Sequence, residues 1–142
     1  MVTNSRKVFI DSSFFLAFID RSDLNHAQAA EIFELVANQR YEVYTSSIVV
    51  IQTYNAIERD FSLAVAYEFL HAMLESSIHV MYIDKSDLDL GFKYIKRNPN
   101  QKGSFPSILK ASLMQKHHIN SLLTFDFWPK YMGIIVSPLI TA

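Results

Sequence analysis

Residues 8–13 read Val-Phe-Ile-Asp-Ser-Ser. Three consecutive apolar residues, two of them β-branched, are typical of a short buried strand. The small polar residues that follow are good helix caps, so the strand is expected to end at Ile10 and a helix to follow at once. This arrangement places Asp11 at the carboxyl end of a buried strand.

The remainder of the chain repeats this alternation of short apolar strands and helices. Strands are predicted at residues 42–45, 78–83, 121–124 and 134–136, and helices at residues 14–19, 25–36, 48–59, 62–73, 86–95 and 104–118. Residues 48–51 are all β-branched and are also compatible with a continued strand. The alternation predicts a single domain over residues 1–142 with an α/β fold, in which three layers, α/β/α, surround a central, mainly parallel sheet.

The composition excludes several classes of protein. The 142 residues are 50% hydrophobic and contain no cysteine, which rules out disulfides, thiol catalysis and zinc fingers. The longest strongly apolar run, residues 14–19, is much shorter than the roughly 20 residues of a membrane span. No small-residue cleavage site follows the first apolar run, so no signal peptide is predicted. We therefore expect a soluble cytoplasmic protein.

Charge is distributed unevenly along the chain. Residues 1–90 hold six Lys/Arg and thirteen Asp/Glu, whereas residues 91–142 hold seven Lys/Arg and a single acid, Asp126. The basic segment contains Lys93, Lys96, Arg97, Lys102, Lys110 and Lys116. Such segregation is typical of a surface that contacts phosphate groups. The alternative is a set of solvated helix faces that carry no function.

Two carboxylates follow predicted strands directly. Asp11 ends the first strand, and Asp126 follows the apolar run at residues 122–125. Functional sites of parallel sheets lie at the carboxyl ends of the strands, and Mg²⁺ prefers oxygen ligands of this kind. The alternatives for Asp11 are a helix cap or hydrogen bonds that hold the following loop. The alternative for Asp126 is a salt bridge to a lysine of the basic segment.

Five segments, in the same order and spacing, resemble a PIN domain, the nuclease-like fold of many bacterial and archaeal toxins. The segments are residues 8–13, 23–30, 45–52, 104–118, and 123–126 followed by 133–136. The resemblance implies a Mg²⁺- or Mn²⁺-dependent endoribonuclease of toxin type. In such a nuclease the metal activates a water that attacks a phosphodiester.

The resemblance also assigns the site residues. It places Asp11, Gln52, Ser107 and Asp126 at the catalytic positions, with Asp11 and Asp126 as the metal ligands. Gln52 stands where the family has a glutamate and Ser107 where it has an aspartate, so the site loses two negative charges. We therefore expect a weakened site and a weakly bound Mg²⁺ or Mn²⁺, with RNA approaching along the basic segment.

Other residues are weaker replacements for the missing acids. Asp84 ends a predicted strand, although a helix cap is the more ordinary role for it. Asn55 shares a helix face with Gln52 but is neutral, and Glu58 points away from that face. The aromatic residues near Asp126 suit either a platform for an unstacked base or core packing. They are Phe125, Phe127, Trp128 and Tyr131.

The two missing acids motivate an alternative function. The chain is then a catalytically degenerate PIN domain that binds RNA or a protein without cleaving anything. The resemblance adds an antitoxin protein as a possible partner and a homodimer as a possible assembly. A third interpretation is an ordinary subunit of an oligomer whose basic face is merely solvated.

Overall fold

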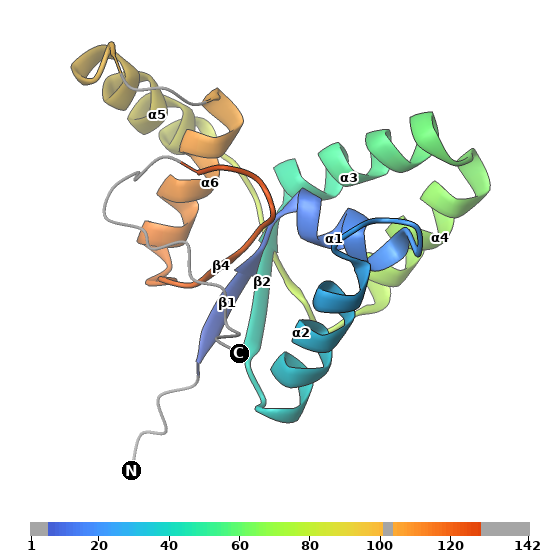
Figure 1. The fold of residues 1–142 in the computed structure, drawn as a ribbon. Helices are drawn as coiled ribbons and strands as arrows, with labels where there is room; N and C mark the ends of the chain where they lie inside the picture. The colour runs from blue at the N-terminus through green and yellow to red at the C-terminus, as the bar shows by residue number, and fades with distance from the viewer. Residues whose placement is uncertain (1–5, 101–103, 129–142) are drawn as a thin grey trace.

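The computed structural model describes residues 6–100 and 104–128, and it has the predicted α/β architecture (Figure 1). Four parallel strands form one sheet in the order β3-β2-β1-β4. The strands are β1 (Lys7–Ile10), β2 (Glu42–Ser46), β3 (His79–Met81) and β4 (Leu122–Leu123). The strand predicted at residues 134–136 lies outside the described residues.

Six helices cover the sheet, in two groups. They are α1 (Ser12–Ile19), α2 (His26–Asn38), α3 (Ser47–Asp60), α4 (Leu63–Glu75), α5 (Lys85–Arg97) and α6 (Phe105–Lys116). Figure 1 shows α1 to α4 on one side of the strands and α5 with α6 on the other. The three-layer arrangement follows, because each helix buries its apolar stripe against the sheet or a neighbouring helix.

Serine caps explain where three of these helices begin. The side chains of Ser46, Ser62 and Ser104 each accept a hydrogen bond from a backbone N–H in the first turn of the following helix. The cap at Ser46 settles the ambiguous segment 48–51 as helix. Asp11 and Asn25 also stand at helix starts, but neither side chain makes a capping hydrogen bond.

The strand register brings the ends of three strands together. Ile10 pairs with Leu123 across β1 and β4, and the N–H of Asp11 donates to the carbonyl of Leu123 at 3.0 Å. Because all strands run the same way, Asp11 and Thr124 emerge side by side at the carboxyl edge. Among the described residues, no helix is both long and apolar enough to cross a bilayer.

Candidate functional site

The candidate site is centred on Asp11, whose side chain is 1% exposed. One carboxylate oxygen, Oδ1, accepts a hydrogen bond from Lys110 Nζ at 2.8 Å. The other, Oδ2, accepts from Thr124 Oγ1 at 3.0 Å and from the Trp128 indole Nε1 at 3.1 Å. Three donors from two separate segments therefore bind the carboxylate of Asp11. Its side chain makes no capping hydrogen bond to α1.

Lys110 enters this site from α6 and is itself buried, with a side chain 5% exposed. Besides Asp11, its Nζ donates to Gln52 Oε1 at 3.1 Å, and it lies 5.7 Å from the centre of the Trp128 ring. The predicted role of Lys110 in contacting RNA phosphates is therefore wrong. Its ammonium group points into the protein because a buried carboxylate and an amide oxygen attract it more strongly than solvent does.

Lys110 links Gln52 to Asp11 by donating to both side chains, whereas the hydroxyl of Ser107 contacts Ser104. Ser107 lies in the first turn of α6, where its Oγ is 2.9 Å from the Oγ of the capping residue Ser104. Lys110 follows Ser107 by three residues and so lies on the same helix face one turn later. The position of the missing aspartate and the position of the lysine therefore belong to one side of one helix.

Asp126 lies at the surface beside this cluster. Its backbone N–H donates to Thr124 Oγ1 at 3.1 Å, and Thr124 Oγ1 is also 2.9 Å from Ser13 Oγ. Partial desolvation, followed by the negative charge of Asp11, raises the pKa of Asp126 above its ordinary value. The positive charge of Lys110 and a hydrogen bond from Ser13 act in the opposite direction without cancelling this effect. Lys110 of the basic segment pairs with Asp11, and no lysine among the described residues forms the salt bridge with Asp126 that the alternative proposed.

These residues do not fit a divalent cation as they stand. A metal at Asp11 would have to displace an ammonium group that already neutralises the carboxylate and occupies the oxygen of Gln52. Within residues 6–100 and 104–128, no three His, Asp or Glu side chains gather closely enough to hold a metal ion. The donor set is one paired carboxylate, one exposed carboxylate and neutral oxygens, which is poor for Mg²⁺ or Mn²⁺.

The other candidate acids have structural roles or face solvent. Asp84 caps α5, and it forms a reciprocal capping box with Asp87. Asn55 and Glu58 are exposed on α3. None of the three replaces a missing site carboxylate.

The aromatic residues divide between packing and exposure. Phe125 stacks on Phe14 with ring centres 5.3 Å apart, and Trp128 is buried against Asp11. Phe127 is 87% exposed, and Tyr131 lies outside the described residues. Of the described members, only Phe127 presents a ring that a base could reach.

The basic segment is partly available to a ligand. Lys93, Lys96 and Arg97 are exposed on the last turns of α5, and Lys116 is 3.6 Å from the buried carboxylate of Asp87. Lys102 lies outside the described residues. The surface that remains is a small basic patch on α5, defined here by Lys93, Lys96 and Arg97.

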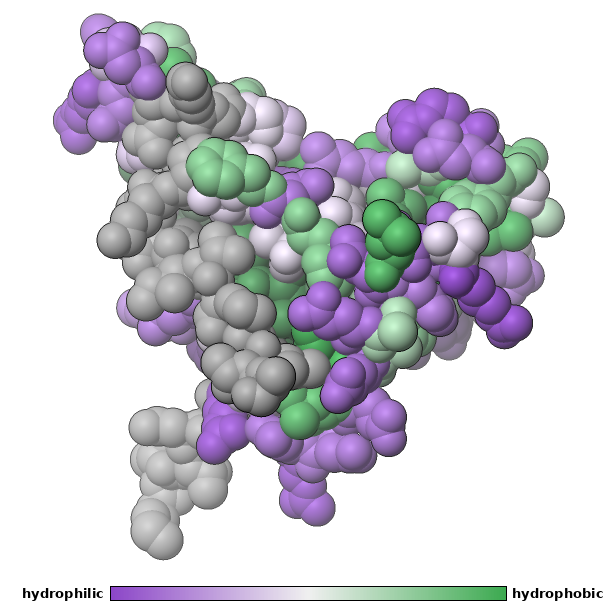
Figure 2. Space-filling model, viewed as in Figure 1, coloured by the Kyte–Doolittle hydropathy of each residue, from purple (hydrophilic) through white to green (hydrophobic). Residues whose placement is uncertain are grey.

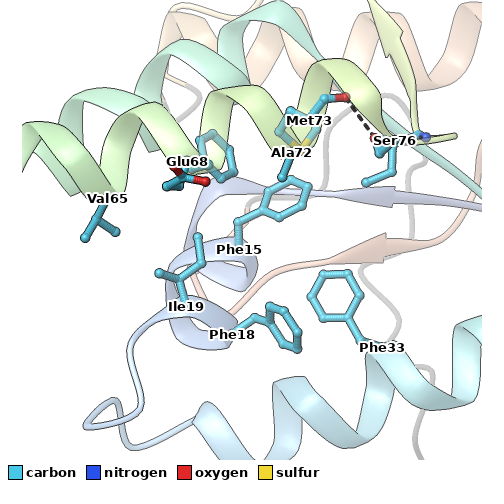
Figure 3. Close-up of a pocket in the computed structure, with 11 residues that line it drawn as sticks. Phe15, Phe18, Ile19, Phe33, Val65, Glu68, Ala72, Met73 and Ser76 are labelled. Atoms are coloured by element: carbon cyan, nitrogen blue, oxygen red, sulfur yellow. Dashed lines mark hydrogen bonds between the residues drawn. The ribbon is translucent and has the colours of Figure 1, made fainter.

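A second feature is an open apolar groove with a volume of about 390 Å³. It is lined by Phe15, Phe18, Ile19, Phe33, Val65, Glu68, Phe69, Ala72, Met73, Ser76 and Ile78. Figure 3 shows the rings of Phe15 and Phe18 from α1 and of Phe33 from α2 turned toward the residues of α4. Figure 2 shows hydrophobic side chains at the surface on the side where α1 and α4 lie.

Sequence reasoning missed Lys110 as an interior group, and it placed Thr124 and Trp128 near the site without predicting that both donate to Asp11. One signal was present for Lys110. It is the only charged residue in the otherwise apolar or small run from Ile108 to Met114, all of which is buried. A lysine with no polar face to occupy must find an internal partner.

Comparisons with known proteins agree on the fold. The model of the PIN domain family matches residues 8–127. The toxin VapC20 of Mycobacterium tuberculosis, which cleaves the sarcin–ricin loop, superposes with a TM-score of 0.74 at 21% identity, over 84% of this chain and 89% of that one. VapBC2 of Rickettsia felis, solved with a fragment of promoter DNA, gives 0.63 at 14% identity, over 84% and 88%. No curated protein matches the sequence.

Proposed function

This chain belongs to the PIN domain family, and we propose that it is a toxin-type member that acts by binding a protein partner rather than by metal-dependent cleavage. The observation that carries the proposal is the buried ion pair between Asp11 and Lys110. The pair occupies the acid on which metal chemistry in this fold would depend. A cytoplasmic location is part of the proposal.

The competing function is the Mg²⁺- or Mn²⁺-dependent endoribonuclease that the resemblance implies. It would require the metal ion to displace Lys110 from Asp11 and Gln52, which would leave the buried ammonium group without its two acceptors. It would also have to work with Gln52 and Ser107 in place of acids. The degenerate alternative needs neither change.

The apolar groove is the surface best suited to a protein partner. Phe18 and Val65 are 44% and 38% exposed on its rim, although apolar side chains gain free energy when they are covered. One of the structural neighbours is a VapBC toxin–antitoxin pair, which supports an antitoxin-like protein as the occupant. An amphipathic helix presents apolar side chains at the spacing such a groove accepts. A basic residue on that helix would match Glu68, the one charged residue of the lining.

Co-expression with an antitoxin-like protein tests the partner. We expect the two proteins to co-purify, and Val65→Glu together with Ala72→Glu to weaken the complex at least about tenfold, because charges in an apolar groove stay unpaired. Tyr67→Glu is the matched control: it lies on the same helix, is exposed, and does not line the groove. Equal loss in the double variant and in Tyr67→Glu would place the partner elsewhere.

A cleavage assay tests the catalytic half of the proposal. Wild type and Asp11→Asn are incubated with structured and single-stranded RNA in Mg²⁺ or Mn²⁺. We expect no cleavage above background from either protein. Cleavage by the wild type that disappears in Asp11→Asn would contradict the proposal and restore the nuclease.

The basic patch on α5 favours RNA as a second candidate ligand. Two of its three cations, Lys93 and Arg97, line a hollow of about 340 Å³ between α5 and α6. Three phosphate contacts predict that log K for single-stranded RNA falls with log[salt] with a slope of about −2. Lys96→Glu should reduce both affinity and slope, whereas Arg21→Glu, an exposed charge reversal before α2, should not.

A further inference from the structure

We propose that Lys110 replaces the divalent cation of the site: its ammonium group is an internal cation bound to Asp11 and Gln52, and a latent metal site lies beneath it. The inference rests on the proposed loss of metal-dependent cleavage. It adds that the ammonium group of Lys110 takes the place of the metal ion. It concerns residues of α6, β1 and α3 and does not depend on which partner the protein binds.

The first argument is the position of the charge. Lys110 Nζ bridges oxygens from two elements, Asp11 Oδ1 at 2.8 Å and Gln52 Oε1 at 3.1 Å. A hard cation would take the same kind of donors, a carboxylate oxygen and a neutral oxygen. The ammonium group therefore joins the end of β1 to α3, as a shared metal ion would.

The second argument is the balance of charge. With Glu at position 52 and Asp at position 107, four carboxylates would face one another and would need a doubly charged ion. In this sequence those positions are neutral, and the buried carboxylate of Asp11 is matched by one ammonium group. The neutral residues Gln52 and Ser107 and the internal cation of Lys110 are thus electrostatically consistent with one another.

The third argument is burial. The side chains of Lys110 and Asp11 are 5% and 1% exposed, which leaves little access for a substrate to the lysine nitrogen. A reactive lysine needs an open path and a deprotonated nitrogen, whereas here the nitrogen donates to two acceptors. Lys110 is therefore a positioning residue and not a catalytic one.

The test measures stability and Mn²⁺ binding, with no substrate present. Four proteins are compared: wild type, Lys110→Met, Lys110→Met with Asp11→Asn, and Lys110→Met with Gln52→Glu and Ser107→Asp. Methionine keeps the length of the side chain and removes its charge. We expect about 1 mM Mn²⁺ to raise the melting temperature of Lys110→Met by roughly 4 °C or more and that of the wild type by less than about 1 °C.

The variant with restored acids should bind Mn²⁺ at least about tenfold more tightly than the wild type in a calorimetric titration, because it has two more acids and no internal cation. The double variant with Asp11→Asn should show no Mn²⁺ stabilisation. Equal Mn²⁺ binding by the wild type and the acid-restored variant would overturn the inference, and so would a Lys110→Met protein as stable as the wild type without metal.

The double variant also decides the outcome if Lys110→Met does not fold. Folding restored by Asp11→Asn would show that the lone buried carboxylate was the cause and would support the inference. Failure of both to fold would mean that Lys110 contributes packing only, and would overturn it. A failed partner or RNA experiment leaves these outcomes unchanged, so the two proposals can fail separately.

Discussion

The carboxyl edge of the sheet and the apolar groove differ in how completely their side chains are bonded or covered within the protein. At the edge, both carboxylate oxygens of Asp11 have donors, and the charge of Lys110 is matched within the protein. In the groove, rim residues such as Phe18 and Val65 remain open to solvent. The site to which the fold family assigns chemistry is closed by internal hydrogen bonds, whereas the groove leaves apolar side chains uncovered.

The largest expected effect comes from breaking the closed site. Lys110→Met leaves Asp11 buried without its counter-ion and should lower the free energy of unfolding by roughly 3–5 kcal/mol. Urea denaturation measures this directly. Lys85→Met is the control, because its ion pair with Asp89 has both side chains exposed, 88% and 57%, so the expected loss is about 0.5 kcal/mol or less. Similar losses of unfolding free energy in the two variants would contradict the claim that the buried pair contributes more to stability than the control pair.

A smaller loss is expected when a neutral donor to Asp11 is removed. Thr124→Val keeps the shape of the side chain but deletes the hydroxyl that bonds Asp11, at a cost of roughly 1–3 kcal/mol. Thr53→Val is the matched control: its buried hydroxyl bonds the carbonyl of Val49, which has a helical partner as well. The control should lose less than about 1 kcal/mol in the same denaturation experiment, and the reverse order would contradict the account.

The groove should show the opposite behaviour, with binding lost and stability kept. Val65→Glu places a charge on the exposed rim and should change the free energy of unfolding by no more than about 0.5 kcal/mol. The complex with the co-expressed partner should nevertheless weaken. A large loss of stability in the isolated variant would indicate that the groove is part of the folded core and not an open surface.

The smallest expected effect concerns pH. Burial and the charge of Asp11 raise the pKa of Asp126 in the folded protein, so protonation of Asp126 favours folding. This contribution is fully present below about pH 3.8 and is lost as the pH rises through the raised pKa. Asp126→Asn should therefore gain stability relative to the wild type at pH 7 and not at pH 3, by no more than about 0.5 kcal/mol because the side chain is exposed. An equal difference at both pH values would contradict the assignment.

Much of the fold could be predicted from local sequence. The strand at residues 8–10, the serine caps and the parallel sheet all follow from patterns within a few residues, and the structure confirms them. The capping role considered for Asp11 was wrong because its carboxylate has stronger partners elsewhere. Those partners lie 99 positions away at Lys110 and 117 at Trp128, beyond what any local pattern reports.

The candidate site was predicted only in part, because its contacts also join residues that are far apart in the sequence. Asp11 and Gln52 do come together, since both end or follow central strands, but through a lysine that the sequence analysis assigned to the surface. The excess of positive charge in residues 91–142 suggested that all lysines of this segment lie on one basic surface. Burial separates Lys110 from Lys93 and Lys96, although all three belong to the same stretch of sequence.

The most direct test of the central claim uses Trp128, the only tryptophan in the chain. Its indole N–H donates to Asp11 at 3.1 Å, so a paramagnetic Mn²⁺ ion bound at Asp11 would broaden the single indole signal in a ¹H–¹⁵N spectrum. We predict that one equivalent of Mn²⁺ leaves this signal sharp in the wild type, because Lys110 holds the position. Broadening in the wild type that disappears in Asp11→Asn would show a metal at Asp11 and contradict the account.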